Sequence, residues 1–282
     1  MLLHQINNSY NTKLFEIFLY RNYPYEPHLH RAYEFIYVLE GKLDVTVQKN
    51  SFELSAGSCC LIAPYHIHSF SGEAVFSIVT FSGSYVASFT KHFEQYVSDL
   101  PCFSLSPHTD LYFRKSFLGD VVLTKKAMNL PDPPAMVIKS VLYGLCAEYA
   151  QKCPLRERSS KEETWFLDML MYMEKNFVSD ITLRDVAKSL GYNYEYISRE
   201  FNKILGISFK TMLNQYRCER ARYLIETTDQ SLTEVAEQSG FQSIRSFNRV
   251  FKQQLGILPS ELKRDRLRSL PRVNKGIHRS GK

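Results

Sequence analysis

One stretch of sequence occurs twice in the second half of this 282-residue chain, and no other feature limits the possible folds as strongly. Residues 186–191 (VAKSLG) return as 235–240 (VAEQSG), and residues 201–207 (FNKILGI) return as 251–257 (FKQQLGI). The spacing between these two landmarks differs by a single residue in the second copy. Self-similarity of this kind predicts that one small supersecondary unit is built twice.

Each copy has the pattern of a helix, a tight turn and a second helix. Thr182 with Asp185, and Ser231 with Glu234, have the spacing at which a side chain caps the first backbone N–H groups of a helix. The glycine at the turn suits a backbone with positive φ. The sequence therefore predicts two helix-turn-helix motifs, at about 182–204 and 231–254.

In such a motif, the N-terminal side chains of the second helix enter the major groove of DNA. Arginine can hydrogen-bond guanine, asparagine adenine and glutamate cytosine, and an aliphatic side chain can contact the thymine methyl group. The predicted base-reading residues are Tyr194, Glu195, Ser198 and Arg199 in the first copy and Ile244, Arg245, Asn248 and Arg249 in the second. Lys252 is a candidate phosphate contact, whereas Ile197, Phe201, Phe247 and Phe251 are assigned to the core.

The segment between the copies, from Ser208 to about Thr227, has the pattern of one helix. At 1.5 Å per residue it would be about 30 Å long, close to the roughly 34 Å of one DNA turn. We therefore expect the two second helices to enter successive major grooves on one face of DNA. The alternative is an all-helical bundle in which the duplication serves packing alone.

Charge is distributed unevenly along the chain. Residues 1–160 hold 14 Lys and Arg against 14 Asp and Glu, whereas residues 161–282 hold 21 against 15. The whole formal net charge of +6 therefore lies in the C-terminal part. A local positive excess favours a polyanionic partner, because neutralising phosphates releases counterions. This favours DNA binding over the packing alternative.

Residues about 165–263 resemble the DNA-binding domain of AraC/XylS-type transcription regulators. The closing signature of that family is visible as AEQSGFQSIRSFNRVFKQQLGILPSELK, residues 236–263. Leu258-Pro259 departs from it, since the family often has a polar residue before the proline. The resemblance implies that Arg217 and Ala221 are structural residues of the linker helix, that RNA polymerase is a partner, and that the protein activates transcription.

The first part of the chain has the short period of β-strands. Leu43, Val45 and Val47 alternate with polar residues, and apolar runs with this character continue from about residue 14 to 81. Breaks are predicted at Gly41-Lys42, Lys49-Asn50 and Ala56-Gly57. An antiparallel sheet or barrel is expected.

Helical spacing begins further along. Residues 136–149 are apolar at helical intervals between prolines, and the polar stretch 152–163 predicts a linker. The predicted fold is multidomain α and β. Its domains are a cupin-like antiparallel β-barrel with dimerisation helices (1–155) and an all-α DNA-binding domain with a double helix-turn-helix (162–268).

Histidines gather at two places in the predicted strands. His28, His30 and Glu34 lie close together in sequence, and a later segment adds His66 and His68. The spacing resembles the cupin pattern, in which two histidines, an acid and a later histidine can hold a metal such as Fe(II) or Mn(II). The two glycines that shape the usual cupin loops are missing, however: Asn22 replaces one, and PYHIH (64–68) lacks the other. We therefore expect no metal and no cofactor.

Three roles are open to these histidines: metal ligands, hydrogen-bonded residues of the barrel wall, or polar anchors for a small effector. We favour the third, because a barrel pocket with a few convergent polar groups suits a small ligand. The predicted effector-binding residues are His28, His30, Glu34, Tyr37, His66, His68 and Phe70. The aromatic residues of this region, Tyr33, Tyr37, Tyr65 and Phe70, favour a carbohydrate.

These patterns indicate a ligand-responsive transcription regulator, not an enzyme, that binds double-stranded promoter DNA as a homodimer through helices at about 108–153. The rival class is a cupin-type metalloenzyme with a helical appendage. The first residues lack the pattern of a leader, and no run of about 18 apolar residues occurs, so we expect a cytoplasmic protein without membrane contact. Six cysteines without a CxxC pair predict buried, reduced thiols.

Overall fold

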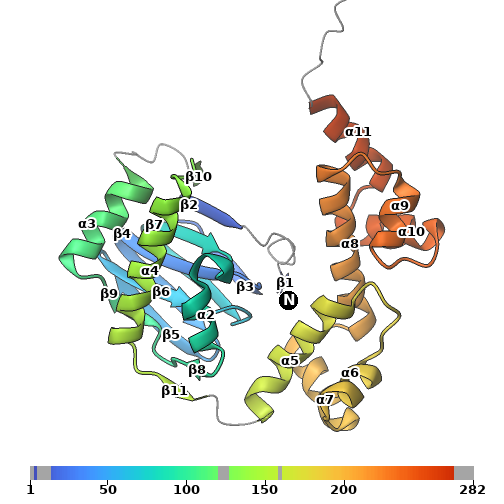
Figure 1. Cartoon of the computed structure of the whole chain (residues 1–282), viewed down its shortest axis with the longest axis horizontal. Helices are drawn as coiled ribbons and strands as arrows, with labels where there is room; N and C mark the ends of the chain where they lie inside the picture. The colour runs from blue at the N-terminus through green and yellow to red at the C-terminus, as the bar shows by residue number, and fades with distance from the viewer. Residues whose placement is uncertain (1–2, 5–13, 120–126, 158–160, 270–282) are drawn as a thin grey trace, which may run out of the picture. The chain divides into compact units, whose positions relative to one another are not determined.

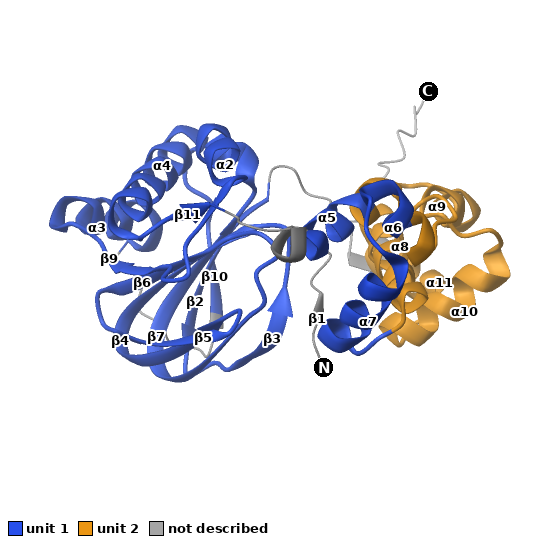
Figure 2. Ribbon diagram, turned by 90° about the horizontal axis from the view of Figure 1, so that it is seen from below, with its two compact units in different colours: residues 1–172, 186–207 blue, residues 173–185, 208–282 orange. Residues whose placement is uncertain are grey.

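The structure, a computed structural model, describes residues 3–4, 14–119, 127–157 and 161–269 (Figure 1). The chain divides into two compact units (Figure 2). One comprises residues 1–172 with 186–207, and the other comprises residues 173–185 with 208–282. The predicted linker includes residues 158–160, which lie outside the described part of the chain, and the domain limits at 155 and 162 stay a prediction.

The strands expected between residues 14 and 81 are present. The described strands are β1 (Leu3–His4), β2 (Phe15–Arg21), β3 (Tyr25–Leu29), β4 (Tyr33–Val47), β5 (Asn50–Ser55), β6 (Ser58–Ile62), β7 (His68–Phe81), β8 (Tyr96–Val97), β9 (Cys102–Ser104), β10 (Ala127–Leu130) and β11 (Arg156–Glu157). Neighbouring strands pair antiparallel except β1 with β3. The long strand β7 is central, since β2, β3 and β4 all pair with it.

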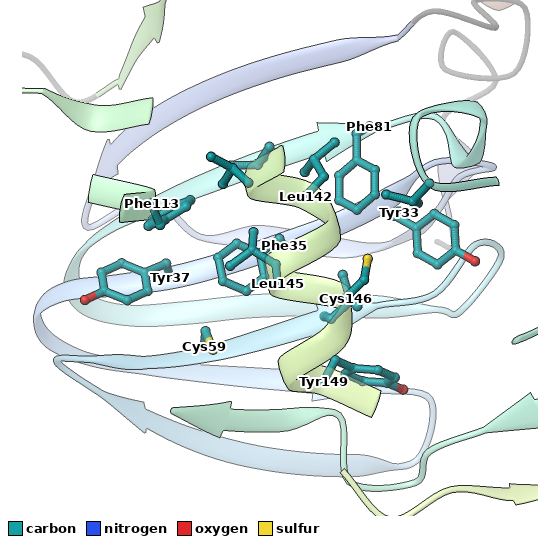
Figure 3. Packing of buried hydrophobic residues seen from close by; sticks show 14 of the residues in the cluster. Tyr33, Phe35, Tyr37, Cys59, Phe81, Phe113, Leu142, Leu145, Cys146 and Tyr149 are labelled. Carbon is teal, nitrogen blue, oxygen red and sulfur yellow. The ribbon is translucent and has the colours of Figure 1, made fainter. Parts of the chain in front are cut away.

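Two apolar clusters lie on opposite faces of β4 and β7. The helix-side cluster includes Phe35 and Phe81 of the sheet and residues of α4 (Ala135–Lys152), and Figure 3 shows their packing. The interior cluster includes Ile36 and Phe76 and draws its other buried members from strands alone. The sheet therefore encloses one core and packs helices against another, as the barrel prediction requires.

Strand β4 changes face in its middle. Val38 pairs with Phe76 and Glu40 with Val75, so Leu39 is an extra residue in the ladder, a β-bulge. Before the bulge, even-numbered residues such as Ile36 face the interior cluster, and after it odd-numbered residues do. The predicted break at Gly41-Lys42 is wrong, because the strand continues through Gly41 with φ of 77°.

Helices and short turns cover the other side of the sheet. They are a 3₁₀ turn η1 (Gly83–Val86), α2 (Ala87–Phe93), α3 (Pro107–Phe113), a π turn η2 (Arg114–Leu118) and α4. The predicted apolar spacing of α4 is confirmed, because Ile138, Val141, Leu142, Leu145 and Tyr149 are buried. All six cysteines are free thiols, five of them buried and Cys102 half-buried, as predicted.

The described residues from 161 onward form helices joined by short turns. The helices are α5 (Lys161–Asn176), α6 (Leu183–Leu190), α7 (Tyr194–Leu205), α8 (Phe209–Thr227), α9 (Leu232–Gln238), α10 (Ile244–Leu255) and α11 (Pro259–Ser269). Both helix pairs lie where the repeat predicts them. The intervening helix α8 is capped by Ser208, whose side chain accepts a hydrogen bond from the Thr211 N–H. No helix among the described residues combines the length and apolar character needed to cross a membrane.

Candidate functional site

The second helix-turn-helix motif, α9 and α10, begins with the predicted cap. The Ser231 hydroxyl accepts from the Glu234 N–H, and the Glu234 carboxylate accepts from the Ser231 N–H, so two otherwise unpaired donors are satisfied. The turn then passes through Gly240 with φ of 84°. Phe241 closes it by donating its N–H to the carbonyl of Ala236 at 2.9 Å.

The core of this motif holds α10 by its apolar face. Phe247 and Phe251 are fully buried and pack in one cluster with Ala236 of α9 and with Ala221 and Ile225 of α8. The assignment of Phe247 and Phe251 to the core is therefore confirmed. Because these residues fix the rotation of α10, the remaining side chains at its start face outward.

The outward face of α10 carries the residues predicted to read bases. Ile244, Arg245 and Arg249 are exposed, Asn248 is half-buried, and Lys252 is exposed one turn further along. The helix starts at Ser243, whose side chain accepts from the Ser246 N–H. A rigid, capped helix thus presents two guanidinium groups, an amide and an ammonium group to solvent. These groups can hydrogen-bond base edges and phosphates.

The first motif, α6 and α7, repeats this construction. Thr182 and Asp185 cap α6 reciprocally, with the Thr182 N–H donating to the Asp185 carboxylate at 2.9 Å. Gly191 has φ of 70°, and the Tyr192 N–H donates to the Ala187 carbonyl at 2.9 Å. This bond matches that between Phe241 and Ala236 in the second motif. The local backbone of the two turns is therefore the same.

The predicted base-reading residues of α7 are accessible to different degrees. Glu195 and Arg199 are exposed, whereas Tyr194 and Ser198 are half-buried. The Arg199 guanidinium lies over the ring of Tyr196, 5.8 Å from its centroid, and donates to Glu200 at 3.3 Å. Ile197 and Phe201 are buried, as predicted.

Arg217 of α8 has a structural position. Its guanidinium is buried and donates to the carbonyls of Phe177 at 2.8 Å and Ser179 at 2.9 Å. It therefore ties α8 to the segment that precedes α6. This contact agrees with the structural role that the family resemblance implies.

A second candidate site lies in the β-sheet. His28 of β3, His30 in the following turn, Glu34 of β4 and His68 of β7 are all buried, and ligand atoms of the four side chains lie within 4.8 Å of one another. His30 Nε2 is 3.0 Å from Glu34 Oε2, and His68 Nε2 is 3.5 Å from Glu34 Oε1. We call these four residues the His/Glu cluster.

Backbone carbonyls orient the three imidazoles of the His/Glu cluster. Nδ1 of His28 donates to Glu26 O at 2.8 Å, Nδ1 of His30 to Ala32 O at 3.0 Å, and Nδ1 of His68 to His66 O at 2.8 Å. A carbonyl can only accept, so each Nδ1 carries a proton. The Nε2 atoms are left for the other members of the cluster or for a ligand.

Burial and neighbouring charge shift the pKa values here. Burial, followed by the charge of His68, lowers the pKa of His28 to about 4. Burial alone would raise the pKa of Glu34, but the charge of His68 and a hydrogen bond from His30 outweigh it and hold that pKa below its usual value. Glu34 is therefore a buried carboxylate.

The other predicted effector residues lie at different places. Phe70 belongs to the interior cluster, near His28. Tyr37 lies on the opposite face of β4 from Glu34, packs in the helix-side cluster, and bonds through its hydroxyl to Asp110 and Arg114. His66 precedes β7 and contributes its carbonyl to His68.

Sequence reasoning missed Tyr25 as a neighbour of the cluster. Its ring centroid lies 4.5 Å from that of His28 and 5.3 Å from that of Phe70. Tyr25 lies on β3 three residues before His28, a spacing that in a regular strand would place the two side chains on opposite faces. An irregularity in the β3–β7 register between them lets the rings meet, and the sequence carries no signal for it.

Two family models match this chain. An AraC-like ligand binding domain matches residues 17–109, which include most of the sheet, and a helix-turn-helix domain matches residues 186–265, which include α7 to α10. The Msm operon regulatory protein of Streptococcus mutans is 24% identical over 258 residues, 87% of this chain and 88% of that protein.

Two further matches cover different shares of this chain. An HTH-type transcriptional regulator of Staphylococcus aureus is 34% identical over 95 residues, which are 34% of this chain and 13% of that protein. The crystal structure of ToxT from Vibrio cholerae O395 matches 92% of this chain and 99% of its own, with 15% identity and a TM-score of 0.49. The two matched sequences thus carry names of regulatory proteins.

Proposed function

Because this chain is an AraC-type transcriptional regulator, with an AraC-like ligand-binding domain and a helix-turn-helix domain, we propose that it binds promoter DNA sequence-specifically through α7 and α10 and adjusts transcription in response to a small molecule. The observation that carries this proposal is the start of α10. Its buried phenylalanines fix the helix, and its arginine, asparagine and lysine side chains point to solvent. The names of the relatives favour regulation over the metalloenzyme alternative.

Each exposed residue has a role in this proposal. Arg245, Arg249 and Asn248 on α10, and Glu195 and Arg199 on α7, read base edges in the major groove. Tyr194, Ser198 and Ile244 complete these surfaces by contacts with bases or sugars. Lys252 neutralises a phosphate and contributes affinity without sequence preference.

The length of α8 supports recognition of two half-sites. Its 19 residues correspond to about 28 Å at 1.5 Å per residue, near the roughly 34 Å of one DNA turn. We expect base preferences of the two motifs to lie about one turn apart.

The N-terminal domain supplies the response. Small-molecule binding there would favour one arrangement of the domains and so change promoter binding or contact with RNA polymerase. We propose activation of transcription and a carbohydrate as the effector, because accessible aromatic rings such as those of Tyr23 and Tyr25 can stack on sugar faces. A regulator of promoter DNA acts in the cytoplasm.

A homodimer is part of the proposal, and two neighbouring helices support it. Leu111 and Tyr112 of α3 and Met136 and Tyr143 of α4 are large apolar residues that are exposed. The hydroxyls of Tyr112 and Ser140 lie 2.7 Å apart and join the two helices. An apolar surface of this kind suits a second copy of the chain.

Selection of binding sites from random DNA, followed by gel shifts of the full chain at 50 and 200 mM salt, tests the DNA proposal. The affinity for DNA should fall steeply as the salt concentration rises from 50 to 200 mM, because the protein neutralises several phosphates. Arg249→Ala and Arg199→Ala should each weaken the selected site by about 1 to 3 kcal/mol and relax the preference at particular base pairs. Lys252→Ala should weaken all sequences alike.

Lys91→Ala in α2 is the matched control, since this exposed lysine lies on the N-terminal domain and should leave the shifts unchanged. If both arginine variants select the same motif as the unmodified chain, the assigned reading positions are wrong. If no DNA sequence is shifted at 50 mM salt, the DNA proposal itself fails.

A further inference from the structure

We propose that the His/Glu cluster, His28, His30, Glu34 and His68, binds one divalent first-row transition-metal ion. This inference goes beyond the proposed function, because DNA recognition by α7 and α10 does not require it. It also gives these residues a different role from the organic-effector anchors that the sequence favoured.

The distances within the cluster fit a common metal centre. Two ligands that are each about 2.1 Å from one ion lie about 3.4 Å apart in a tetrahedral site and about 3.0 Å apart in an octahedral one. The separations from Glu34 are 3.0 Å between Oε2 and His30 Nε2 and 3.5 Å between Oε1 and His68 Nε2. All four residues offer atoms within 4.8 Å of one another, so small rotations of the side chains would complete the site.

Hydrogen bonds to backbone carbonyls hold the three imidazoles in the orientation that a metal site requires. Metal-bound histidines usually donate their other ring N–H to a carbonyl or carboxylate, which fixes both tautomer and ring direction. His28, His30 and His68 each do this through Nδ1, to the carbonyls of Glu26, Ala32 and His66. In each of the three histidines, Nε2 is therefore the ring nitrogen that the backbone does not hold, and it can bind an ion when it carries no proton.

Two polar atoms of the cluster are buried without a hydrogen bond. They are Glu34 Oε1 and His68 Nε2, on side chains that are 6% and 1% exposed. Leaving such atoms unpaired is costly. A cation between them would satisfy both, and it would balance the charge of the buried carboxylate.

The burial of the site favours an ion over an organic effector at this position. The relative exposures of His28, His30, Glu34 and His68 are 2%, 2%, 4% and 1%. Side chains with so little accessible surface leave no room for a sugar between them. A metal ion is small enough, because it would occupy only the space between the ligand atoms.

The donor set selects the class of metal. Three imidazoles and one carboxylate suit Zn²⁺, Fe²⁺ or Mn²⁺, whereas Ca²⁺ and Mg²⁺ prefer oxygen ligands alone. Four protein ligands fill a tetrahedral shell, as in structural zinc sites. Since the ligands come from β3, the turn after it, β4 and β7, the ion would tie three strands together.

Two glycines of the usual cupin loops are missing from this chain, which is why we expect no metal from the sequence. In the structure, Asn22 adopts φ of 49°, the left-handed conformation that a glycine would supply, and its N–H donates to the carbonyl of Ala74. Tyr65 adopts φ of 63°, and its N–H donates to the carbonyl of His30. Both loops therefore take left-handed turns without glycine, so the missing glycines are no reason to expect that a metal is absent.

The test uses the full chain, purified without a histidine tag, stripped with a chelator and titrated with Co²⁺. We expect saturable binding of one Co²⁺ per chain, with the visible absorption of a four-coordinate ion. Saturating Zn²⁺ should raise the Tm of the N-terminal transition by roughly 5 to 10 °C at a hundredfold excess over Kd.

Two variants locate the site, and one controls for it. His68→Ala removes a ligand, and Glu34→Gln keeps the size of the side chain and can still accept from His30. Each should weaken Co²⁺ binding at least about 100-fold. His108→Ala, in an exposed histidine of α3, should bind as the unmodified chain does.

Absence of saturable Co²⁺ and Zn²⁺ binding by the unmodified stripped chain would overturn the proposal, as would unchanged affinity in Glu34→Gln. If His68→Ala does not fold, the unmodified chain and Glu34→Gln still decide the outcome. Gel shifts of the stripped chain keep this test separate from the proposed function, because DNA binding should persist without metal.

Discussion

Replacing Gly240 by alanine should destabilise the second helix-turn-helix motif far more than the same change in the first. The backbone of Gly240 has φ of 84°, a conformation that costs an L-residue about 1 to 2 kcal/mol. An added Cβ would also lie 2.6 Å from the carbonyl oxygen and 2.7 Å from the Cα of Val178. Both contacts are with backbone, so a rotamer change cannot relieve them.

The Val178 segment is held in place, which sets the size of the effect. Arg217 donates to the carbonyls on either side of it, at Phe177 and Ser179, so movement away from the new Cβ would strain these bonds. Overpacking against a fixed neighbour costs about 1 to 3 kcal/mol. Together with the backbone term, Gly240→Ala should cost about 2 to 5 kcal/mol.

Gly191→Ala is the matched control, because Gly191 has the equivalent place in the first motif. Its φ is 70°, but none of the described residues places an atom within 4 Å of an added Cβ, so only the backbone cost of about 1 to 2 kcal/mol remains. Thermal unfolding followed by circular dichroism at 222 nm measures the difference. Equal losses of Tm in the two variants would refute the argument from the contact with Val178.

Two further changes test other contacts. Arg217→Ala should cost about 2 to 4 kcal/mol in urea unfolding, because it leaves the carbonyls of Phe177 and Ser179 unpaired, and Arg217→Lys should recover only part of this. Glu148, whose carboxylate bonds Lys152 and Ser106, should confer acid sensitivity. Burial opposes ionisation, but these bonds lower its pKa to about 2. Its contribution is thus present above its ordinary pKa of 4.5 and lost as pH falls towards 2. Between pH 5 and pH 3, the free energy of unfolding should fall by about 1 to 2 kcal/mol less in Glu148→Gln than in the unmodified chain. An unchanged pH profile in the variant would contradict this assignment.

The helix-turn-helix motifs could be predicted because every signal for them is local. The caps at Thr182 and Ser231 act on backbone groups three residues away, and each turn needs only a glycine and a helical period on both sides. Because the same pattern occurs twice, the prediction of each motif supports the prediction of the other. The same local reasoning correctly assigned Ile197 and Phe247 to the core.

The β-sheet could be predicted only in part, because its details depend on partners far away in sequence. Gly41 looked like a turn residue, yet β4 pairs with β7 along its whole length. The His/Glu cluster shows the same limit. Its members were identified from sequence, but the carbonyls that orient them and the left-handed backbones of Asn22 and Tyr65 appear only in three dimensions. Tyr37 was grouped with Glu34, although residues three apart in a regular strand point to opposite faces.

The bulge at Leu39 sets a rule for insertions and deletions in β4. Because the strand exchanges its inner and outer residues at this point, Tyr33, Phe35 and Tyr37 pack under helices while Leu43 and Val45 pack inside the sheet. Loss of Leu39 alone would remove the bulge and restore a regular ladder in which both halves keep their orientation, whereas loss of two residues would turn one half of the strand inside out. In homologous proteins, a strand that lacks this bulge should therefore be one residue shorter at this position.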